Sequence, residues 1–420
     1  MPRRRAILVN AALVCGSTLG MVLLLELGVR LLQPQPLAAV SRSARLGWTH
    51  KPNTDIVYER SEFRIPVHFS SAGLRDGEYP FVKPAGTARI AWFGDSFVEA
   101  VQVPADSCAE TRLEAHLQSH PPDTRRWEVL NFGVSGYGTC QQLLLLEEQG
   151  LRFEPDVVLS QLYFNDLEDD RRFGLCSLDA KEQLVVAPTP KLGWKATAAG
   201  HLKSLLYQHS QLWMFVSTRK PRSVRPAGGG SALEPGAAAG AAAAVPLPDV
   251  APRPTESSTA TAWLPVPSCP GRHLSHEWRM TLHELPDDTR RAIEQHAAIW
   301  ERMAELSRAR GARFTAVLGV SKTQLDPEIY ARTLAEMGCD PVAHDVELPA
   351  ARLAAAAGAR GIEVVDLLPA FRAAVQREPL HFQFDGHWNA AGHRVAAAAL
   401  YDALVARGTL VAGKSSEVHP

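Results

Sequence analysis

The sequence lacks an excess of charge of either sign. Its 420 residues include 44 Lys and Arg against 45 Asp and Glu, which gives a formal net charge of −1. A protein with this balance has no overall field that would attract it to nucleic acid or to an acidic surface. Its binding partners therefore have to be inferred from individual sites.

The cysteines lack the spacing of a metal site. The sequence contains no Cys-x-x-Cys pair and no Cys/His cluster with the spacing of a zinc ligand set. We therefore expect no metal and no cofactor. In an oxidising compartment, Cys176 and Cys269 could form a disulfide, and buried free thiols are the alternative. The six cysteines are Cys15, Cys108, Cys140, Cys176, Cys269 and Cys339.

The Gly-x-Ser-x-Gly elbow of α/β-hydrolases is also missing. The stretch Gly133-Val134-Ser135-Gly136 comes nearest to it, but Tyr137 stands where the second glycine is required. A serine nucleophile, if the chain has one, must therefore lie in a different sequence context.

A long apolar run is present at the N-terminus. Residues 6–25 contain no charged side chain, and as a helix they would extend about 30 Å, the thickness of a bilayer core. Three arginines precede the run and Arg30 alone follows it closely, which places the N-terminus in the cytoplasm. We predict a single-pass protein of the cytoplasmic (inner) membrane, anchored by residues 1–30, with the remaining chain extracytoplasmic. A cleaved signal peptide is the alternative.

Three further regions follow the anchor. Residues 31–87 are rich in turn residues and predict a stalk with short strands. In residues 88–408, short apolar runs alternate with helical periods, which predicts a three-layer α/β/α domain with a five-stranded parallel sheet. Residues 409–420 are expected to form a flexible tail. The five predicted strands are RIAWFG, WEVLNFG, DVVLSQLYF, RFTAVLGV and IEVVDLL.

An insertion, residues 167–285, interrupts the predicted domain. Its central part, about 221–265, consists mainly of Ala, Pro and Gly, so it cannot build a core and is predicted to be disordered. The preceding stretch, 201–218, has an amphipathic pattern. We interpret it as a helix packed on the domain, with a lipid-facing lid as the alternative.

Polar residues and glycines cluster where the predicted strands end. Ligands of parallel α/β sheets bind at this edge. Ser96 follows the first strand within Gly-Asp-Ser, and Gly136 follows the second within VLNFGVSGYG. Asn165 ends the third strand, and Asp385 and His387 come after the fifth. Because residues two apart in an extended segment project to the same side, Asp385 and His387 are expected to face one pocket.

These four blocks resemble those of the SGNH (GDSL-like) hydrolases in their order and in their positions at strand ends. The resemblance covers about residues 88–408, apart from the insertion, and implies a flavodoxin-like SGNH fold. It also implies that Ser96 is the nucleophile, His387 the base and Asp385 the group that orients the imidazole. The oxyanion hole would consist of the Ser96 and Gly136 amides and the Asn165 side chain.

Two positions depart from the family pattern. Tyr163 replaces the glycine of Gly-x-Asn-Asp, which predicts a narrower pocket wall. The last block is Asp-x-His, whereas many members have Asp-x-x-His; this is similar to membrane-linked members and to acetylation proteins of bacterial exopolysaccharides. Asp385 is thus assigned less directly than Ser96.

Other polar residues near these blocks have structural interpretations. Asp95 and Asp166 are predicted to hold loops through hydrogen bonds to backbone amides. His393 is expected on the surface or in packing on the last helix. Ser135 is the alternative nucleophile, but its glycine-rich loop suits the donation of backbone amides better.

The predicted reaction is acyl transfer. A serine hydroxyl needs a neighbouring base, and neutral histidine suits this role near pH 7. We predict a membrane-anchored SGNH esterase that cleaves O-acyl, and specifically O-acetyl, esters on carbohydrate. The alternatives are an O-acetyltransferase acting on exopolysaccharide or cell-envelope glycan, a lipid-ester hydrolase and a non-catalytic glycan-binding scaffold. The expected partners are an acyl ester or acylated glycan and the membrane, without nucleic acid.

Overall fold

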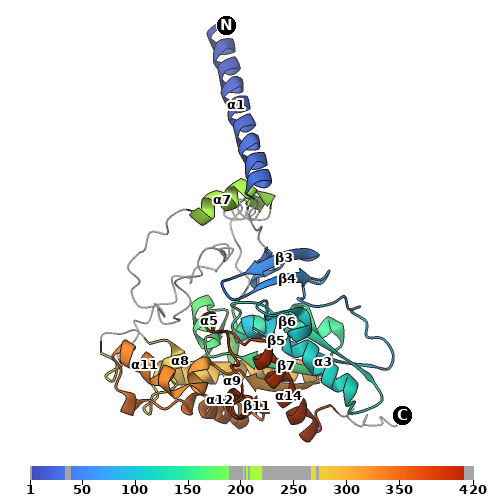
Figure 1. Ribbon diagram of the computed structural model, residues 1–420, viewed down its shortest axis with the longest axis vertical. Coiled ribbons are helices and arrows are strands. Elements are labelled where there is room, and N and C mark those ends of the chain that lie inside the picture. Colours follow the sequence, from blue (N-terminus) through green and yellow to red (C-terminus); the bar gives the residue numbers. More distant parts are fainter. Residues whose placement is uncertain are drawn as a thin grey trace.

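The computed structural model describes most of the chain (Figure 1). The predicted disordered stretch of the insertion and most of the predicted C-terminal tail lie outside the described residues. The described residues are 2–33, 39–188, 209–219, 266–270 and 274–410, together with Leu202, Leu205 and Leu206.

A five-stranded parallel sheet forms the centre of the molecule. Its strand order is β11-β10-β7-β5-β6, and every pairing in it is parallel. The predicted α/β fold with five parallel strands is confirmed. All five strands also occupy the stretches predicted from the sequence. They are β5 (Thr87–Gly94), β6 (Arg126–Gly133), β7 (Val157–Leu162), β10 (Arg313–Leu318) and β11 (Val364–Asp366).

Helices cover both faces of the sheet, so the fold has three layers. Along β5 the side chains alternate between two cores: Ile90 and Trp92 belong to one, whereas Ala91 and Phe93 belong to the other. Each fully buried large side chain contributes about 1.5–3 kcal/mol. The first core includes α3 (Ala109–Ser119), α13 (Leu368–Val375) and α14 (Ala390–Ala406), and the second includes α4 (Thr139–Glu148), α9 (Asp287–Arg308) and α12 (Leu348–Ala359).

Shorter elements connect these layers. The hairpin of β8 (Cys176–Leu178) and β9 (Leu184–Val186) lies in the first part of the insertion, and α8 (His276–Arg279) lies near its end. The remaining elements are α2 (Ser96–Glu99), η1 (Ala105–Ser107), η2 (Gly150–Phe153), α5 (Asp166–Phe173), β8 (Cys176–Leu178), β9 (Leu184–Val186), α8 (His276–Arg279), α10 (Lys322–Leu325), α11 (Pro327–Met337) and η3 (Pro341–Ala343).

The region predicted as a stalk with short strands contains two antiparallel β-hairpins. The first joins β1 (Val40–Ser43) to β2 (Gly47–His50), and the second joins β3 (Thr54–Glu59) to β4 (Arg64–Phe69). Trp48 of β2 is buried in the same core as α4 and α9. The hairpins therefore pack against the domain rather than extending away from it.

The N-terminal helix α1 (Pro2–Leu32) projects away from the domain (Figure 1). Its segment Val9–Leu32 is long and apolar enough to cross a membrane, although a signal sequence would have the same features. The helix α7 (Gln211–Arg219) lies across the C-terminal end of α1, the end nearer the domain. The main neighbour of α7 is thus α1, and not the α/β domain on which we expected this amphipathic stretch to pack.

A carboxylate on α1 explains this docking. Glu26 accepts hydrogen bonds from the Gln211 and Leu212 amides, both at 2.9 Å, and from the Ser210 hydroxyl at 2.8 Å. The first turn of a helix has free N–H groups, which a negative charge stabilises. Arg30 bonds Glu26 at 2.7 Å and the His209 carbonyl at 2.6 Å, so it completes the junction.

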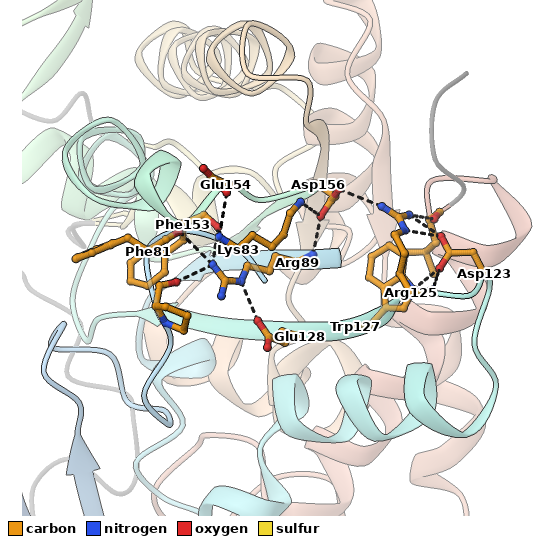
Figure 2. A network of polar contacts seen from close by, with 12 residues as sticks. Phe81, Lys83, Arg89, Asp123, Arg125, Trp127, Glu128, Phe153, Glu154 and Asp156 are labelled. Carbon is orange, nitrogen blue, oxygen red and sulfur yellow. Dashed lines mark hydrogen bonds and ion pairs between the residues drawn. The ribbon is translucent and has the colours of Figure 1, made fainter. Parts of the chain in front are cut away.

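A network of charged residues holds the opposite end of the sheet from the predicted site (Figure 2). Arg89, near the start of β5, is fully buried and donates to Glu128 at 2.8 Å. Asp156, just before β7, accepts from the Arg89 amide at 2.7 Å, from Lys83 at 2.6 Å and from Arg125 at 3.1 Å. Each buried charge therefore has a partner, which a low-dielectric interior requires.

Two disulfides differ from the predicted pairing. Cys140 on α4 pairs with Cys176 on β8, and Cys269 pairs with Cys339 after α11. The suggested Cys176–Cys269 bond is therefore wrong. The sequence offered no spacing from which these pairs could be chosen, because the fold alone brings α4 beside β8. Cys15 and Cys108 are free thiols, the first exposed and the second buried.

Candidate active site

Ser96 lies where β5 ends and α2 begins. Asp95 caps this helix, because its carboxylate accepts the Phe97 amide at 3.0 Å. The turn is tight: a Cβ atom on Gly94 would come within 2.3 Å of a Val98 methyl group. Gly94 is suited to this turn because it has no Cβ atom to clash with Val98. Asp95 is suited to the next position because its side chain caps the helix. The Ser96 hydroxyl therefore stands at the carboxyl edge of the sheet.

The three predicted catalytic side chains form one hydrogen-bonded chain. His387 Nε2 lies 2.8 Å from Ser96 Oγ, and His387 Nδ1 lies 2.5 Å from Asp385 Oδ1. Burial raises the pKa of Asp385, but the hydrogen bonds and charge of His387 outweigh it and lower that pKa below its ordinary value. An ionised Asp385 accepts a hydrogen bond from the Nδ1–H group, which keeps the ring proton on Nδ1 and leaves Nε2 free to accept the serine proton.

The loop that carries Asp385 and His387 is a turn rather than the extended segment we expected. Gly386 has a φ of +84°, a conformation that glycine adopts without strain, and the residues around it form bends. Trp388 then anchors the loop, because its indole N–H donates to the Val320 carbonyl at 2.9 Å. The two side chains thus meet through a glycine turn.

The predicted oxyanion donors come from the ends of three neighbouring strands. Gly136, with a φ of +77°, lies on the loop after β6, and Asn165 lies between β7 and α5. The Ser96 and Gly136 amides donate no hydrogen bond to another backbone group in the part of the chain that the structure describes. Both amides are therefore available to a ligand.

Asn165 is held by a neighbouring carboxyl group. Its Nδ2 donates to Asp169 Oδ2 at 3.1 Å. Burial is the largest cause that raises the pKa of Asp169 to about 7, and the charge of Asp95 adds to it. Burial likewise raises the pKa of Asp95 to about 6, and the Phe97 amide and His387 oppose this shift. Two titratable carboxyl groups thus lie beside the proposed oxyanion hole.

Three other predicted residues have structural contacts. Asp166 is fully buried and accepts the Gln142 side-chain amide at 3.2 Å, and burial raises its pKa well above the ordinary value. Ser135 gives its hydroxyl and its amide to Glu99, so it is not placed as a second nucleophile. His393 is buried, and its ring centroid lies 5.6 Å from that of Trp388, so it packs in the interior.

A group of metal-binding residue types occurs away from this site. Cys269, Cys339 and His344 have ligand atoms within 4.8 Å of one another. The two sulfur atoms form a disulfide, and a disulfide sulfur is not the thiolate that binds metal ions. This group therefore does not offer a metal site in the structure described.

Sequence reasoning missed the residues that hold the site from outside the strand-end blocks. Glu62 and His50 come from the region predicted as a stalk, and Glu99 follows Ser96 by three residues. Glu99 is a charged residue among apolar neighbours, whereas Glu62 and His50 stand beside other polar residues. Neither pattern identifies a partner far along the chain.

Comparisons with known proteins agree with the arrangement. Residues 278–418 match the family described as SGNH hydrolase-like domain, acetyltransferase AlgX. These residues are similar in sequence to the SGNH hydrolase-like family. The match includes Asp385 and His387, whereas the Ser96 block precedes it. No curated protein matches the sequence.

Several solved structures show weak similarity. An α/β hydrolase from the Lake Arreo metagenome, LAE5, is 14% identical, covers 79% of this chain and 98% of its own, and has a TM-score of 0.37. The acetyl xylan esterase AlAXEase is 11% identical over 75% and 99%, with a TM-score of 0.37. Axe2, an acetylxylan esterase from Geobacillus stearothermophilus, is 11% identical over 75% and 93%, with a TM-score of 0.35. Such low scores do not establish a shared function.

The family match and the serine–histidine–aspartate arrangement together support an ester-processing enzyme of the SGNH hydrolase-like kind.

Proposed function

We propose that this protein is a membrane-anchored serine enzyme that cleaves O-acetyl esters on carbohydrate through an acetyl-serine intermediate at Ser96. The observation that carries this proposal is the chain of hydrogen bonds from Ser96 through His387 to Asp385. A hydroxyl, an imidazole and a carboxylate in this order are what nucleophilic acyl transfer requires.

The reaction begins with attack by Ser96 on the acetyl carbonyl while His387 Nε2 takes the hydroxyl proton. The oxyanion that forms would receive hydrogen bonds from the Ser96 and Gly136 amides and the Asn165 side chain. When the ester C–O bond breaks, His387 returns the proton to the leaving sugar oxygen. Water then attacks the acetyl-serine, releases acetic acid and restores Ser96.

Aromatic rings beside Ser96 favour a small acyl group. Phe97 stacks on Tyr163 with ring centroids 4.0 Å apart, and its ring centroid lies 4.8 Å from that of His387. Tyr163 stands where the family has glycine, so its ring fills space that would otherwise be open. An acetyl group needs less room than a longer acyl chain.

A small hollow at the same edge of the sheet would meet one edge of a bound carbohydrate. Trp278 and Tyr330 stack with ring centroids 5.6 Å apart, and Phe164, the neighbour of Asn165, also lines this pocket. The side chains of Ser321 and Thr323 add hydroxyl groups. The hollow is too small to enclose a sugar ring, so these aromatic rings and hydroxyl groups would contact only one edge of a sugar that binds outside it.

The proposed location is extracytoplasmic. The arginines in the first turns of α1 favour a cytoplasmic N-terminus, and the disulfides Cys140–Cys176 and Cys269–Cys339 are typical of an oxidising compartment. Docking of α7 on α1 gives less support to a lid over the active site, and hence to a lipid-ester hydrolase. A complete catalytic set also argues against a non-catalytic scaffold.

An O-acetyltransferase is the second candidate, favoured by the match to a family described by an acetyltransferase. In this reaction a sugar hydroxyl, instead of water, attacks the acetyl-serine, and His387 takes its proton. The same residues serve both reactions, so the acceptor distinguishes them.

The test is to label the full-length protein, purified in detergent, with a fluorophosphonate probe, alongside Ser96→Ala. We expect labelling at Ser96 and turnover of 4-nitrophenyl acetate in the parent, and neither in the folded variant. Adding acetyl donor with an oligosaccharide then separates the candidates: free acetate indicates hydrolysis, and acetylated oligosaccharide indicates transfer. Labelling or turnover that survives in Ser96→Ala would contradict the proposal.

A further inference from the structure

The two N-terminal hairpins contact both loops that form the catalytic site. The turn between β3 and β4 reaches the loop of Asp385 and His387, and β2 reaches the loop of Gly136. Trp48 and Ser135 lie 87 positions apart in the chain, and Glu62 and Asp385 lie 323 positions apart. They concern a part of the chain that lies outside the matched family region.

Glu62 caps the acid–base loop. Its Oε1 accepts the Gln383 amide at 2.7 Å, and its Oε2 accepts the Phe384 and Asp385 amides, both at 2.8 Å. Three successive N–H groups therefore point at one carboxylate, an arrangement that only an acceptor can satisfy. The third of these amides belongs to the residue that orients His387.

Glu99 performs a similar task at the oxyanion loop. Its Oε2 accepts the Ser135 amide at 2.7 Å and also the Ser135 hydroxyl, while its Oε1 lies 3.0 Å from His50 Nε2. The Trp48 indole donates to the Ser135 carbonyl at 3.3 Å. Every polar group of Ser135 is thus bonded, so the position of the Gly136 amide next to it is fixed.

His50 is bonded on both ring nitrogens. Nδ1 lies 2.9 Å from the Gly73 carbonyl oxygen, and Nε2 faces the Glu99 carboxylate. Both neighbours are oxygen atoms, so each ring nitrogen faces a group that can accept a hydrogen bond from it. Burial raises the pKa of Glu99, but the charge and hydrogen bond of His50, with the Ser135 bonds, lower it overall. Glu99 and His50 thus form a buried pair with their hydrogen bonds satisfied.

We propose that Glu62 and the Glu99–His50 pair are positioning residues for catalysis: Glu62 sets the loop of Asp385 and His387, and Glu99 with His50 sets the amide of Gly136. The inference rests on the proposed function, because it assigns both loops to acyl transfer. The hairpins are then a part of the active site, and not only a spacer between the anchor and the domain.

The two contacts should alter catalysis differently. Glu62→Gln places an amide N–H against N–H donors, so the loop shifts and the Asp385–His387 bond weakens. The Asp385 carboxylate stabilises protonated His387. A weaker bond between the two should therefore move the acidic limb of the kcat/KM profile to lower pH. Glu99→Gln disturbs an oxyanion donor, so kcat should fall without a shift of that limb. Around Asp385 and His387, the other charged or titratable groups are Asp95, His381 and His393, with Arg60 and Tyr58 beside Asp385 and Lys322 bonded to the Gln383 carbonyl.

The experiment measures kcat, KM and the pH profile of 4-nitrophenyl acetate hydrolysis for the full-length parent, Glu62→Gln and Glu99→Gln in detergent. Glu59→Gln is the matched control, since Glu59 lies on the same hairpin with its side chain 63% exposed and contacts Arg64. Circular dichroism and the melting temperature report whether each variant is folded.

We expect kcat to fall about 10- to 100-fold in both test variants with little change in KM, because small displacements of catalytic groups have effects of this size. Glu59→Gln should match the parent. Folded Glu62→Gln with the parent's kcat and pH profile would overturn the role of Glu62. Folded Glu99→Gln with the parent's kcat would overturn the role of Glu99. If Glu99→Gln does not fold, the Glu62 variant still tests the hairpin. A parent that neither hydrolyses the ester nor reacts at Ser96 would instead contradict the proposed function.

Discussion

Replacing Asp385 by asparagine tests the catalytic assignment at the position where the sequence departs from the family pattern. Asp385 lies 2.5 Å from His387 Nδ1, and Ser96 Oγ lies 2.8 Å from Nε2. Asparagine can donate its amide N–H to Nδ1, which leaves the ring proton on Nε2. Nε2 then faces Ser96 as a donor and no longer accepts its proton.

The expected loss follows from this change of tautomer. Because the pKa of Asp385 is lowered, the carboxylate is ionised at pH 7, and its full effect on His387 is removed by the substitution. Triads that lose their aspartate in this way lose a factor of about 10⁴ in kcat. We expect about 10³ to 10⁴ here, or about 4–5.5 kcal/mol of transition-state stabilisation. KM should change little, because the proton is transferred only in the transition state.

The assay is hydrolysis of 4-nitrophenyl acetate at pH 7 by the full-length protein in detergent. Asp366→Asn is the matched control: this carboxylate accepts the Leu368 amide at 2.9 Å at the end of the edge strand β11. The control should keep the parent's kcat. Folded Asp385→Asn with activity within tenfold of the parent would refute the orienting role, and an equal loss in the control would show that the effect is not specific.

Three further predictions concern the oxyanion hole, the disulfides and a buried histidine. Asn165→Ala should lower kcat about 100- to 1000-fold with little change in KM, and a rise in KM alone would make Asn165 a binding residue instead. Replacing Cys140 and Cys176 together by alanine should lower the free energy of unfolding by about 4 kcal/mol, since the bond closes a loop of 36 residues; a urea titration that shows under about 1 kcal/mol would contradict this. Burial lowers the pKa of His393 to about 3. Below pH 6.5 the unfolded chain therefore takes up a proton at His393 that the folded chain does not. The contribution of His393 to the free energy of unfolding is thus fully present above pH 6.5 and is lost as the pH falls. His393→Gln should reduce the loss of stability between pH 7 and pH 5 by about 2 kcal/mol, and an unchanged pH dependence would exclude this cause.

The sequence alone was sufficient for the features that depend on local patterns. Continuous apolar runs such as 90–93 predicted the buried parallel strands, because such strands are covered on both faces. Ser96 and Asn165 could be placed at the same sheet edge, since the carboxyl ends of parallel strands meet there. The long apolar run before Leu32 predicted a helix that can cross a membrane.

Only the tertiary structure determined the contacts between distant segments. Glu62 bonds a loop 321 to 323 positions away, Glu26 caps a helix 185 positions away, and Cys140 pairs with Cys176 rather than leaving it for Cys269. Hydrophobic periodicity records which face of an element is buried, but it does not record what covers that face. A polar side chain such as Glu62 or His50 gains its role from the residues that the folded chain brings into contact with it. The residues adjacent to it in the sequence do not indicate which residues those are.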